Sequence, residues 1–425
     1  MKKAISIILT LALSFSLIAC GNQTAPETPA AEATPEAVQP TAAAKTPEPT
    51  QPTEPAQTPE PVQTPEPTPE PTPEPTPEPT PEPSVRFTKL SSGNCHALAL
   101  DTDGRIWGWG KNQYSCLGNF DRLTDEPALL CDAAVFTDVQ ASIDFSAALD
   151  ADGGLWTWGT NTSGQLGDGS TDERGEPARV LENVASFAVG YDYVAAIAAD
   201  GTLYTWGNGS RHMLLKQKTD DTANVLTPTP VDTPLRFSYV ASGMGGCIAY
   251  DTDGIRYAWG LSNGVAGYDA AQIGFSSGDN VVPYVLKPIT DDTVGRSEFV
   301  IGSGTVYALN EGDLYLAGGK DSRLTAFESD PSFYQFALVK EGIKAVHVAM
   351  YGMLALDADG NVWGWGGSAF PPCPHGELTQ LTDGIAFSDV VLLNDIDQKV
   401  FAIDKDGNLY TWLAEGETPR EVPVG

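Results

Sequence analysis

The sequence predicts an all-β repeat protein, either a propeller or another array, because one short pattern recurs seven times. Each copy has a small apolar run, a turn that ends in glycine, and an aromatic residue followed two positions later by Trp-Gly in most copies. The turn glycines are spaced by 49, 48, 53, 58, 48 and 47 residues. A unit of this kind cannot bury its apolar side alone, so it needs neighbours. The turn glycines are Gly104, Gly153, Gly201, Gly254, Gly312, Gly360 and Gly407.

Two aromatic positions follow each turn glycine, and together they hold all nine tryptophans of the chain. Their spacing of two residues places both side chains on the same face of a strand. Each copy is therefore predicted to be strand, tight turn, strand, with a glycine at the strand end where another backbone approaches closely. We assign the second aromatic position to the core, although exposed tryptophans there would suit sugar stacking, and Ala317 replaces tryptophan in the fifth copy. The predicted core tryptophans are Trp109, Trp158, Trp206, Trp259, Trp365 and Trp412.

Besides the turn of residues 150–153, four turns have the sequence Asp-x-Asp-Gly, which resembles part of a calcium-binding loop. An EF-hand loop also needs another ligand before its glycine and a glutamate at its end, and these turns have neither. Asp-Gly between two apolar runs is first of all a hairpin turn, because both residues tolerate positive φ. We predict turns here, and no metal or cofactor site. The four turns begin at Asp101, Asp251, Asp357 and Asp404.

Residues 1–20 have the features of a secretory signal rather than of a folded unit. Lys2 and Lys3 precede an apolar run, and the run closes with the residues Leu17 to Cys20. That closing stretch resembles a bacterial lipobox, which implies cleavage before Cys20 and a lipid on its sulfur. A plain signal peptide with an incidental cysteine is the alternative. The run is too short for a good permanent membrane span.

Residues 21–84 are predicted to be a disordered Pro/Thr/Glu-rich linker. They contain 20 of the 33 prolines and end in Thr-Pro-Glu-Pro repeats. Proline at every second position removes backbone donors and fixes φ, so neither helix nor sheet forms. We interpret the segment as an extended stalk between a membrane anchor and a domain, with low-complexity filler as the alternative.

The formal net charge is −32, to which the signal contributes +2 and the linker −10, so residues 85–425 carry −24. An acidic domain repels phosphate backbones, which argues against nucleic-acid binding. Besides Cys20 there are five cysteines without the spacing of a disulfide framework. Cys116 and Cys131 lie in one repeat and either pair or stay free, and Cys247 is expected to be a small buried residue.

The loop of the second copy runs Trp158-Gly159-Thr160-Asn161 and continues to Gly164-Gln165-Leu166-Gly167. This stretch resembles the repeat of the regulator of chromosome condensation family, and the resemblance covers residues 85–425. The loop is degraded in the other copies: the first retains Asn112, Leu117 and Gly118, and copies five to seven lose it. The resemblance implies a seven-bladed β-propeller of four-stranded antiparallel blades. We interpret Pro419 to Val424 as the strand that completes a blade next to Val85–Leu90.

The sequence contains no recognisable catalytic motif, which predicts that the protein is not an enzyme. The leading hypothesis is a monomeric, lipid-anchored binding module on the extracytoplasmic side of a cell membrane, with propeller loops presented to an unidentified protein partner. Binding of cell-wall glycan is the first alternative, and an extracytoplasmic enzyme is the second. The resemblance also brings in nucleotide exchange on a small GTPase, which does not suit an exported bacterial protein. Whether the host has one membrane or two stays open.

A position directly before each apolar strand varies between copies while the strand register stays fixed, which suggests a binding surface. Tyrosine and phenylalanine at such a position would anchor a protein contact. The alternative is that these are ordinary loop residues. The predicted partner-binding residues are His96, Asp144, Phe145, Tyr191, Asp192, Tyr193, Tyr351, Asp397 and Lys399.

Overall fold

A computed structural model shows a β-propeller of seven four-stranded antiparallel sheets. Cys20, the linker, Tyr351 and Asp397 lie outside the part of the chain that the structure describes. The described residues contain no helix that could span a membrane. The structure describes residues 85–94, 96–112, 115–118, 123–209, 214–215, 223–243, 246–260, 286–289, 294–302, 305–318, 336–349, 352–366, 378–393, 398–413 and 417–424.

Each blade consists of four strands that follow one another in the sequence, so blade 1 contains β1 to β4 and blade 7 contains β25 to β28. The first strands are β1 (Phe87–Ser92), β5 (Phe136–Ala141), β9 (Val184–Val189), β13 (Phe237–Ser242), β17 (Glu298–Ile301), β21 (Ile343–Val348) and β25 (Phe387–Leu392). The second strands are β2 (His96–Asp101), β6 (Phe145–Asp150), β10 (Tyr193–Ala198), β14 (Cys247–Asp251), β18 (Thr305–Asn310), β22 (Gly352–Asp357) and β26 (Lys399–Asp404). The third strands are β3 (Ile106–Lys111), β7 (Leu155–Gly159), β11 (Leu203–Gly207), β15 (Arg256–Trp259), β19 (Asp313–Gly318), β23 (Val362–Gly366) and β27 (Leu409–Leu413). The fourth strands are β4 (Leu123–Cys131), β8 (Arg174–Leu181), β12 (Val225–Pro230), β16 (Lys287–Ile289), β20 (Ala337–Lys340), β24 (Thr379–Gln380) and β28 (Arg420–Glu421).

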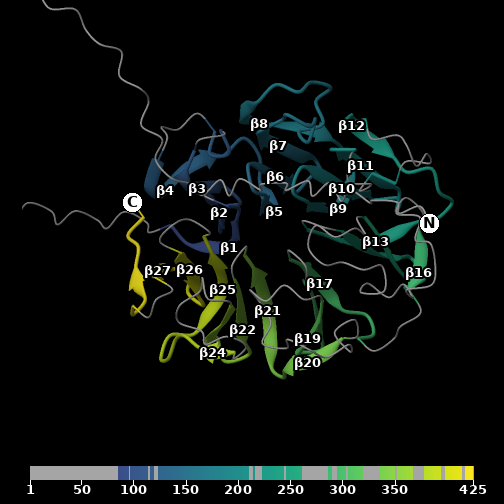
Figure 1. Cartoon of the computed structure of the whole chain (residues 1–425). Coiled ribbons are helices and arrows are strands. Elements are labelled where there is room, and N and C mark those ends of the chain that lie inside the picture. The colour runs from purple at the N-terminus through teal and green to yellow at the C-terminus, as the bar shows by residue number, and fades with distance from the viewer. Residues whose placement is uncertain are drawn as a thin grey trace, which may run out of the picture. The chain divides into compact units, whose positions relative to one another are not determined.

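The first strands surround the centre of the ring and the fourth strands lie at its rim (Figure 1). Each first strand contacts the first strands of the two neighbouring blades, and the contact between β25 and β1 completes the circle. The tail of the chain does complete a blade, but β28 pairs with β27 and not with β1. The ring therefore closes by the packing of blade 7 on blade 1, and no blade combines strands from the two ends of the chain.

The core consists of separate apolar clusters, one at each junction between neighbouring blades. All six predicted core tryptophans are at least 97% buried, and each packs against the blade before its own. Trp158 of blade 2, for example, packs with Leu98 and Ile106 of blade 1. Burial of these rings is the main apolar contribution to holding the blades together.

A backbone hydrogen bond links neighbouring blades at six of the seven junctions. The N–H that opens the first strand of one blade donates to the carbonyl of the turn glycine of the blade before it, as Phe136 does to Gly104 at 2.8 Å. Blades 7 and 1 are joined by the same bond, from Phe87 to Gly407 at 2.9 Å. Positive φ at the turn glycine, +74° at Gly104, is the reason that the pattern requires glycine there.

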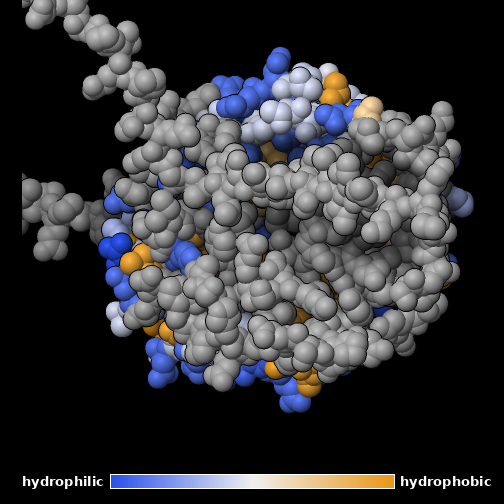
Figure 2. Space-filling model, in the orientation of Figure 1, coloured by the Kyte–Doolittle hydropathy of each residue, from blue (hydrophilic) through white to orange (hydrophobic). Residues whose placement is uncertain are grey.

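The described surface around the rim is mostly hydrophilic, with isolated hydrophobic positions (Figure 2). Its large exposed apolar side chains are separated from one another in the sequence and occur in or next to blades 1, 4 and 5. They are Leu129, Val135, Ile255 and Leu338.

Candidate functional site

The aspartate that opens each Asp-Gly turn positions the first aromatic residue of the next strand. Asp150 Oδ1 accepts the backbone N–H of Gly154 at 2.7 Å, and Oδ2 accepts Nε1–H of Trp156 at 2.7 Å. Burial alone would raise the pKa of Asp150, but the bonds from Trp156, Gly154 and Arg179 outweigh it and leave the pKa below its usual value. These carboxylates are used within the turn, and no group of three potential metal ligands occurs among the described residues. The equivalent aspartates are Asp101, Asp251, Asp357 and Asp404.

The loop between β7 and β8 is attached to blade 3 by the residues of its own motif. Asn161 Oδ1 accepts the N–H of Leu166 at 2.9 Å, and the Leu166 side chain is completely buried. The carbonyl of Gln165 accepts Nε1–H of Trp206 at 3.0 Å. A Cβ on Gly167 would lie 2.7 Å from that same indole nitrogen, so the loop can approach only with glycine there. The motif thus holds the loop in place and does not itself form a site.

Blade 1 repeats this arrangement with fewer residues of the motif. Asn112 Oδ1 accepts the N–H of Leu117 at 2.8 Å, and the carbonyl of Cys116 accepts Nε1–H of Trp158 at 2.8 Å. Trp109 belongs to blade 1 and packs against blade 7. Its Nε1 has no such partner among the described residues. Blade 7 lacks the loop motif in its sequence.

Three of the predicted partner-binding side chains are buried between blades, so the prediction that they are exposed anchors is wrong. Each lies opposite the glycine that ends the third strand and reaches the next blade. His96 Nε2 lies 3.0 Å from Ser146 Oγ, and the Tyr193 hydroxyl donates to the carbonyl of Gly243 at 2.8 Å. Phe145 packs in the apolar cluster between blades 2 and 3. The position varies because each side chain fits a different junction.

Asp144 and Tyr191 remain partly exposed, in turns of the neighbouring blades 2 and 3. Burial raises the pKa of Asp144 to about 6. Asp192 is more than nine-tenths buried and accepts Nδ2–H of Asn208 at 2.6 Å, whereas Lys399 is partly exposed.

The turns between first and second strands are closed by one repeated backbone hydrogen bond. In blade 2 the N–H of Ser142 donates to the carbonyl of Phe145 at 2.8 Å, and five other blades have the same three-residue span. In blade 7 the bond joins Leu393 to Lys399 at 2.9 Å, so this turn is three residues longer. These bonds join the ends of the first and second strands in every blade, and the turns of blades 2 and 3 are described throughout.

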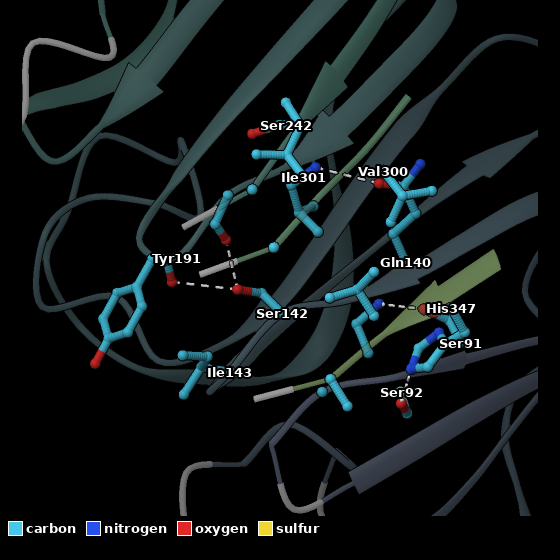
Figure 3. A pocket seen from close by; sticks show the side chains of 18 of the residues that line it. Ser91, Ser92, Gln140, Ser142, Ile143, Tyr191, Ser242, Val300, Ile301 and His347 are labelled. Atoms are coloured by element: carbon cyan, nitrogen blue, oxygen red, sulfur yellow. Dashed lines mark hydrogen bonds between the residues drawn. The ribbon is translucent and has the colours of Figure 1, made fainter. Parts of the chain in front are cut away.

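The ring of turns surrounds the mouth of a central channel, which holds a cavity of about 260 Å³. Its walls come from the ends of the first strands and from the turns of blades 1 to 6 (Figure 3). Among the described residues that line it there is no Asp, Glu, Lys or Arg, although the propeller is strongly acidic. The polar lining side chains are Ser91, Ser92, Asn94, Gln140, Ser142, Tyr191, Ser242 and His347.

Hydrogen bonds fix the polar groups of this wall. Ser142 Oγ donates to the carbonyl of Gly190 at 2.5 Å, and Ser92 Oγ donates to the carbonyl of Leu392 at 2.8 Å. His347 Nε2 lies 3.0 Å from Ser92 Oγ. Because the Ser92 hydroxyl hydrogen is used by Leu392, we assign the donated hydrogen to His347 Nε2. Burial lowers the pKa of His347 to about 4, so its ring is neutral at pH 7.

The sequence profile of the regulator of chromosome condensation repeat matches residues 103–149 and 152–197, and a second profile of that repeat matches 87–116 and 136–165. All of these matches fall within residues 87–197. This part of the chain therefore carries repeats of the regulator of chromosome condensation type, within a propeller of seven four-stranded blades.

Among solved structures of the regulator of chromosome condensation type, yeast Prp20 bound to Kap60 has a TM-score of 0.62 at 19% identity, over 80% of this chain and 81% of that one. Prp20p from Saccharomyces cerevisiae, in a structure concerned with its binding to Gsp1p and histones, has a TM-score of 0.59 at 22% identity, over 72% and 80%. Human WBSCR16 has a TM-score of 0.59 at 18% identity, over 73% and 85%. At these identities the similarity shows the fold alone.

The human E3 ubiquitin-protein ligase HERC2 is 27% identical over 190 residues, which is 41% of this chain. The chain spans about 4% of the length of that relative.

Sequence reasoning did not find the channel mouth. Its lining residues occupy equivalent positions of successive repeats, as Ser91, Gln140 and His347 do, each two residues before the residue whose N–H closes the turn. The residue types differ from repeat to repeat, so they form no motif. Among the described cysteines, Cys116, Cys131 and Cys247 form no disulfide, so the pairing of Cys116 with Cys131 is not formed. Cys247 is buried, as expected for a small core residue, and burial raises the pKa of its thiol to about 12.

Proposed function

We propose that this propeller is a protein-binding module, displayed outside the cytoplasmic membrane by a lipid on Cys20 and by the stalk of residues 21–84. The observation that carries the proposal is the pair of turns at the channel mouth that contain Ile143, Asp144 and Tyr191. All three side chains are partly exposed on backbone that hydrogen bonds already fix. Binding through such turns costs little ordering entropy.

The family relationship supports a protein partner in general but not a particular one. The Prp20 structures concern the binding of that protein to Kap60, Gsp1p and histones. Histones are not expected outside a cytoplasmic membrane, and identities of 19% and 22% transfer no contact residues. The partner is therefore expected to be a cell-surface or secreted protein.

The protein-binding proposal is tested by crosslinking intact cells that make the full chain, followed by purification of the chain and its partners. Ile143→Ala combined with Tyr191→Ala should abolish recovery of a discrete partner, while the melting temperature stays within a few degrees of the parent. Val135→Ala is the matched control, because Val135 is exposed directly before β5, at the opposite end of that strand from Ile143. Capture that survives the double substitution, or that persists after protease treatment of the target surface, would contradict the proposal.

The anchoring proposal is tested separately by metabolic labelling with a fatty acid that carries an alkyne group. The parent chain should incorporate the label and remain with the membranes, and Cys20→Ser should lose the label. Equal labelling of both chains would exclude Cys20 as the lipid attachment point.

A further inference from the structure

The channel mouth has the chemistry of a small-molecule site. Ile143 and Tyr191 of the protein-binding turns lie at its edge, but most of its lining comes from residues that the protein-binding proposal does not use. The cavity of about 260 Å³ is lined by residues from six blades, so the ring itself fixes its shape. A concave site with apolar walls and a few placed polar groups is the usual form of a ligand pocket. Here the apolar part of the wall is contributed by Val189, Val300, Val346 and Val348, together with Ile301.

The charge of the wall restricts the class of ligand. The described lining residues have no charged side chain, and His347 is neutral at pH 7. Against the described part of the wall, a cation would lose its water without gaining a carboxylate, and an anion would meet no positively charged side chain. The ligand that fits this part of the wall is uncharged.

The polar groups of the wall are arranged to exchange hydrogen bonds with hydroxyl groups. Ser91 Oγ accepts the N–H of Ala141 at 2.9 Å, and this bond leaves the Ser91 hydroxyl hydrogen unused. Ser142 Oγ donates its own hydrogen to Gly190, so its lone pairs are available as acceptors. Gln140 is held at both ends, since Nε2 donates to the carbonyl of Phe187 at 3.0 Å and Oε1 accepts the N–H of Val189 at 3.2 Å. Ser91 thus offers a donor and Ser142 an acceptor, on a wall that Gln140 helps to hold in place.

From these observations we infer that the channel mouth binds a short, neutral saccharide, with the sugar hydroxyls against the serine side of the wall and the C–H face against the valines. Figure 3 shows the two kinds of side chain facing the same space, with Tyr191 at its edge. Hydrogen bonds from the serine side would orient the sugar, and the valine side would pack against its C–H face. A sugar ring has both hydroxyl groups and a non-polar face, so it needs both kinds of contact.

The inference is tested with glucose, cellobiose and N,N′-diacetylchitobiose added to the isotope-labelled full chain, followed by backbone NMR shifts. At least one sugar should give saturable shifts that concentrate on the amides of Ser91, Ser142, Gly190, Gly243 and Gly302. Shifts that are absent for all three sugars, or that concentrate on the outer strands, would overturn the inference. This measurement needs no variant, so it does not depend on how a substitution folds.

A cavity-filling variant then separates this site from the protein-binding turns. Val300→Trp should lower the affinity for the responding sugar at least about tenfold, because the indole occupies the space of the ring. Val135→Trp is the matched control at the exposed position directly before β5, and it should leave the affinity unchanged. Unchanged affinity in a folded Val300→Trp chain would overturn the inference. Partner capture should survive Val300→Trp but not Ile143→Ala with Tyr191→Ala, so the two proposals fail separately.

Discussion

At the scale of single residues, the molecule uses its polar side chains mainly as internal supports. Asp150 is one case, since its two oxygens bind the turn and Trp156 at once. His96 is another, since its ring is completely buried against Ser146 of the next blade. The Ser146 hydroxyl donates to the carbonyl of Cys116 at 3.3 Å, so His96 Nε2 is the donor toward Ser146. Acidic and imidazole groups in this chain are therefore not by themselves signs of chemistry.

The buried His96 ring leads to a prediction about how the stability of the protein depends on pH. Burial lowers its pKa to about 4, well below the value of about 6.5 expected in the unfolded chain. The unfolded state therefore binds more protons between these two values, and the stability that depends on neutral His96 is lost as the pH falls from about 6.5 to 4. His96→Phe, which copies the residue found at Phe145, should make the melting temperature less sensitive to pH in this window. The comparison is melting temperature against pH for both chains.

Burial also lowers the pKa of His347 to about 4. The melting temperature of the His96→Phe chain should therefore still fall in part as the pH falls, because His347 is unchanged. Identical pH profiles for the parent and His96→Phe chains would show that His96 does not contribute.

The sequence predicted the position of these residues better than their roles. The second aromatic position was assigned correctly to the core, because Trp158 and Trp206 recur at a fixed register beside a glycine. The position of His96, Phe145 and Tyr193 was assigned to the surface because it varies. At these three residues the variation reflects three different junctions, and a sequence without the structure does not show which side chain lies across each junction.

At the scale of elements, the third strand of one blade and the loop between the third and fourth strands of the preceding blade act as one unit. Trp206 on β11 packs between blades and donates to the carbonyl of Gln165 in the loop of blade 2. The loop motif and the tryptophan repeat are therefore parts of one arrangement, although they occur about 40 residues apart in the sequence. The sequence shows both patterns, but it does not show that they are in contact.

Trp206→Phe should loosen this loop. It removes the hydrogen bond to Gln165 and leaves unfilled volume, with an expected cost of about 2 to 4 kcal/mol in the free energy of unfolding. Hydrogen exchange at Leu166 and Gly169, whose amides are bonded within or across the loop, should accelerate. Tyr204→Phe, on the same strand, is the control and should leave this exchange unchanged. If these amides exchanged at the same rate in both variants, the order of the loop would not depend on the indole of Trp206.

The outer strands carry a second feature of the sequence that the structure explains. The fourth strands of blades 1 to 4 each contain proline, such as Pro127 in β4 and Pro177 in β8. A strand at the edge of a sheet can pair with a strand of another molecule, and proline prevents this because it lacks the N–H donor. The expectation of a monomer agrees with these edges, although it stays a prediction.

At the scale of the whole molecule, the ring is not uniform. Six junctions use the bond to the turn glycine, but the junction of blades 4 and 5 has two tyrosine hydroxyls instead. The N–H of Ser297 donates to the Tyr250 hydroxyl at 3.0 Å, and the N–H of Phe299 donates to the Tyr239 hydroxyl at 2.7 Å. Blade 5 is also the one in which Ala317 stands at the tryptophan position.

Removing both hydroxyls should weaken this junction before the others. Tyr239→Phe with Tyr250→Phe leaves two N–H groups without their acceptors, at an expected cost of about 2 to 4 kcal/mol in the free energy of unfolding. Exchange should rise first at the amides of Ser297 and Phe299. Tyr315→Phe, which packs against the same cluster, is the control. Uniform destabilisation of all seven blades would show that the ring unfolds only as a whole.

The seven-bladed architecture was predictable because it depends on a count of repeats, which the sequence displays directly. The identity of the last blade's fourth strand was less secure, because Arg420–Glu421 is a two-residue strand with no pattern of its own. The channel mouth was beyond reach, since it exists only once six distant strand ends are brought together.

The bond from Phe87 to Gly407 has a consequence for how the chain can be cut and rejoined. It is the same bond that links the interior blades, and Val85, Val422 and Val424 pack in a single cluster at that junction. Each blade is complete within one stretch of sequence, so the starting point of the ring is arbitrary. A circular permutant that joins residue 424 to residue 85 and begins at residue 133, between blades 1 and 2, would therefore retain every sheet and every apolar cluster.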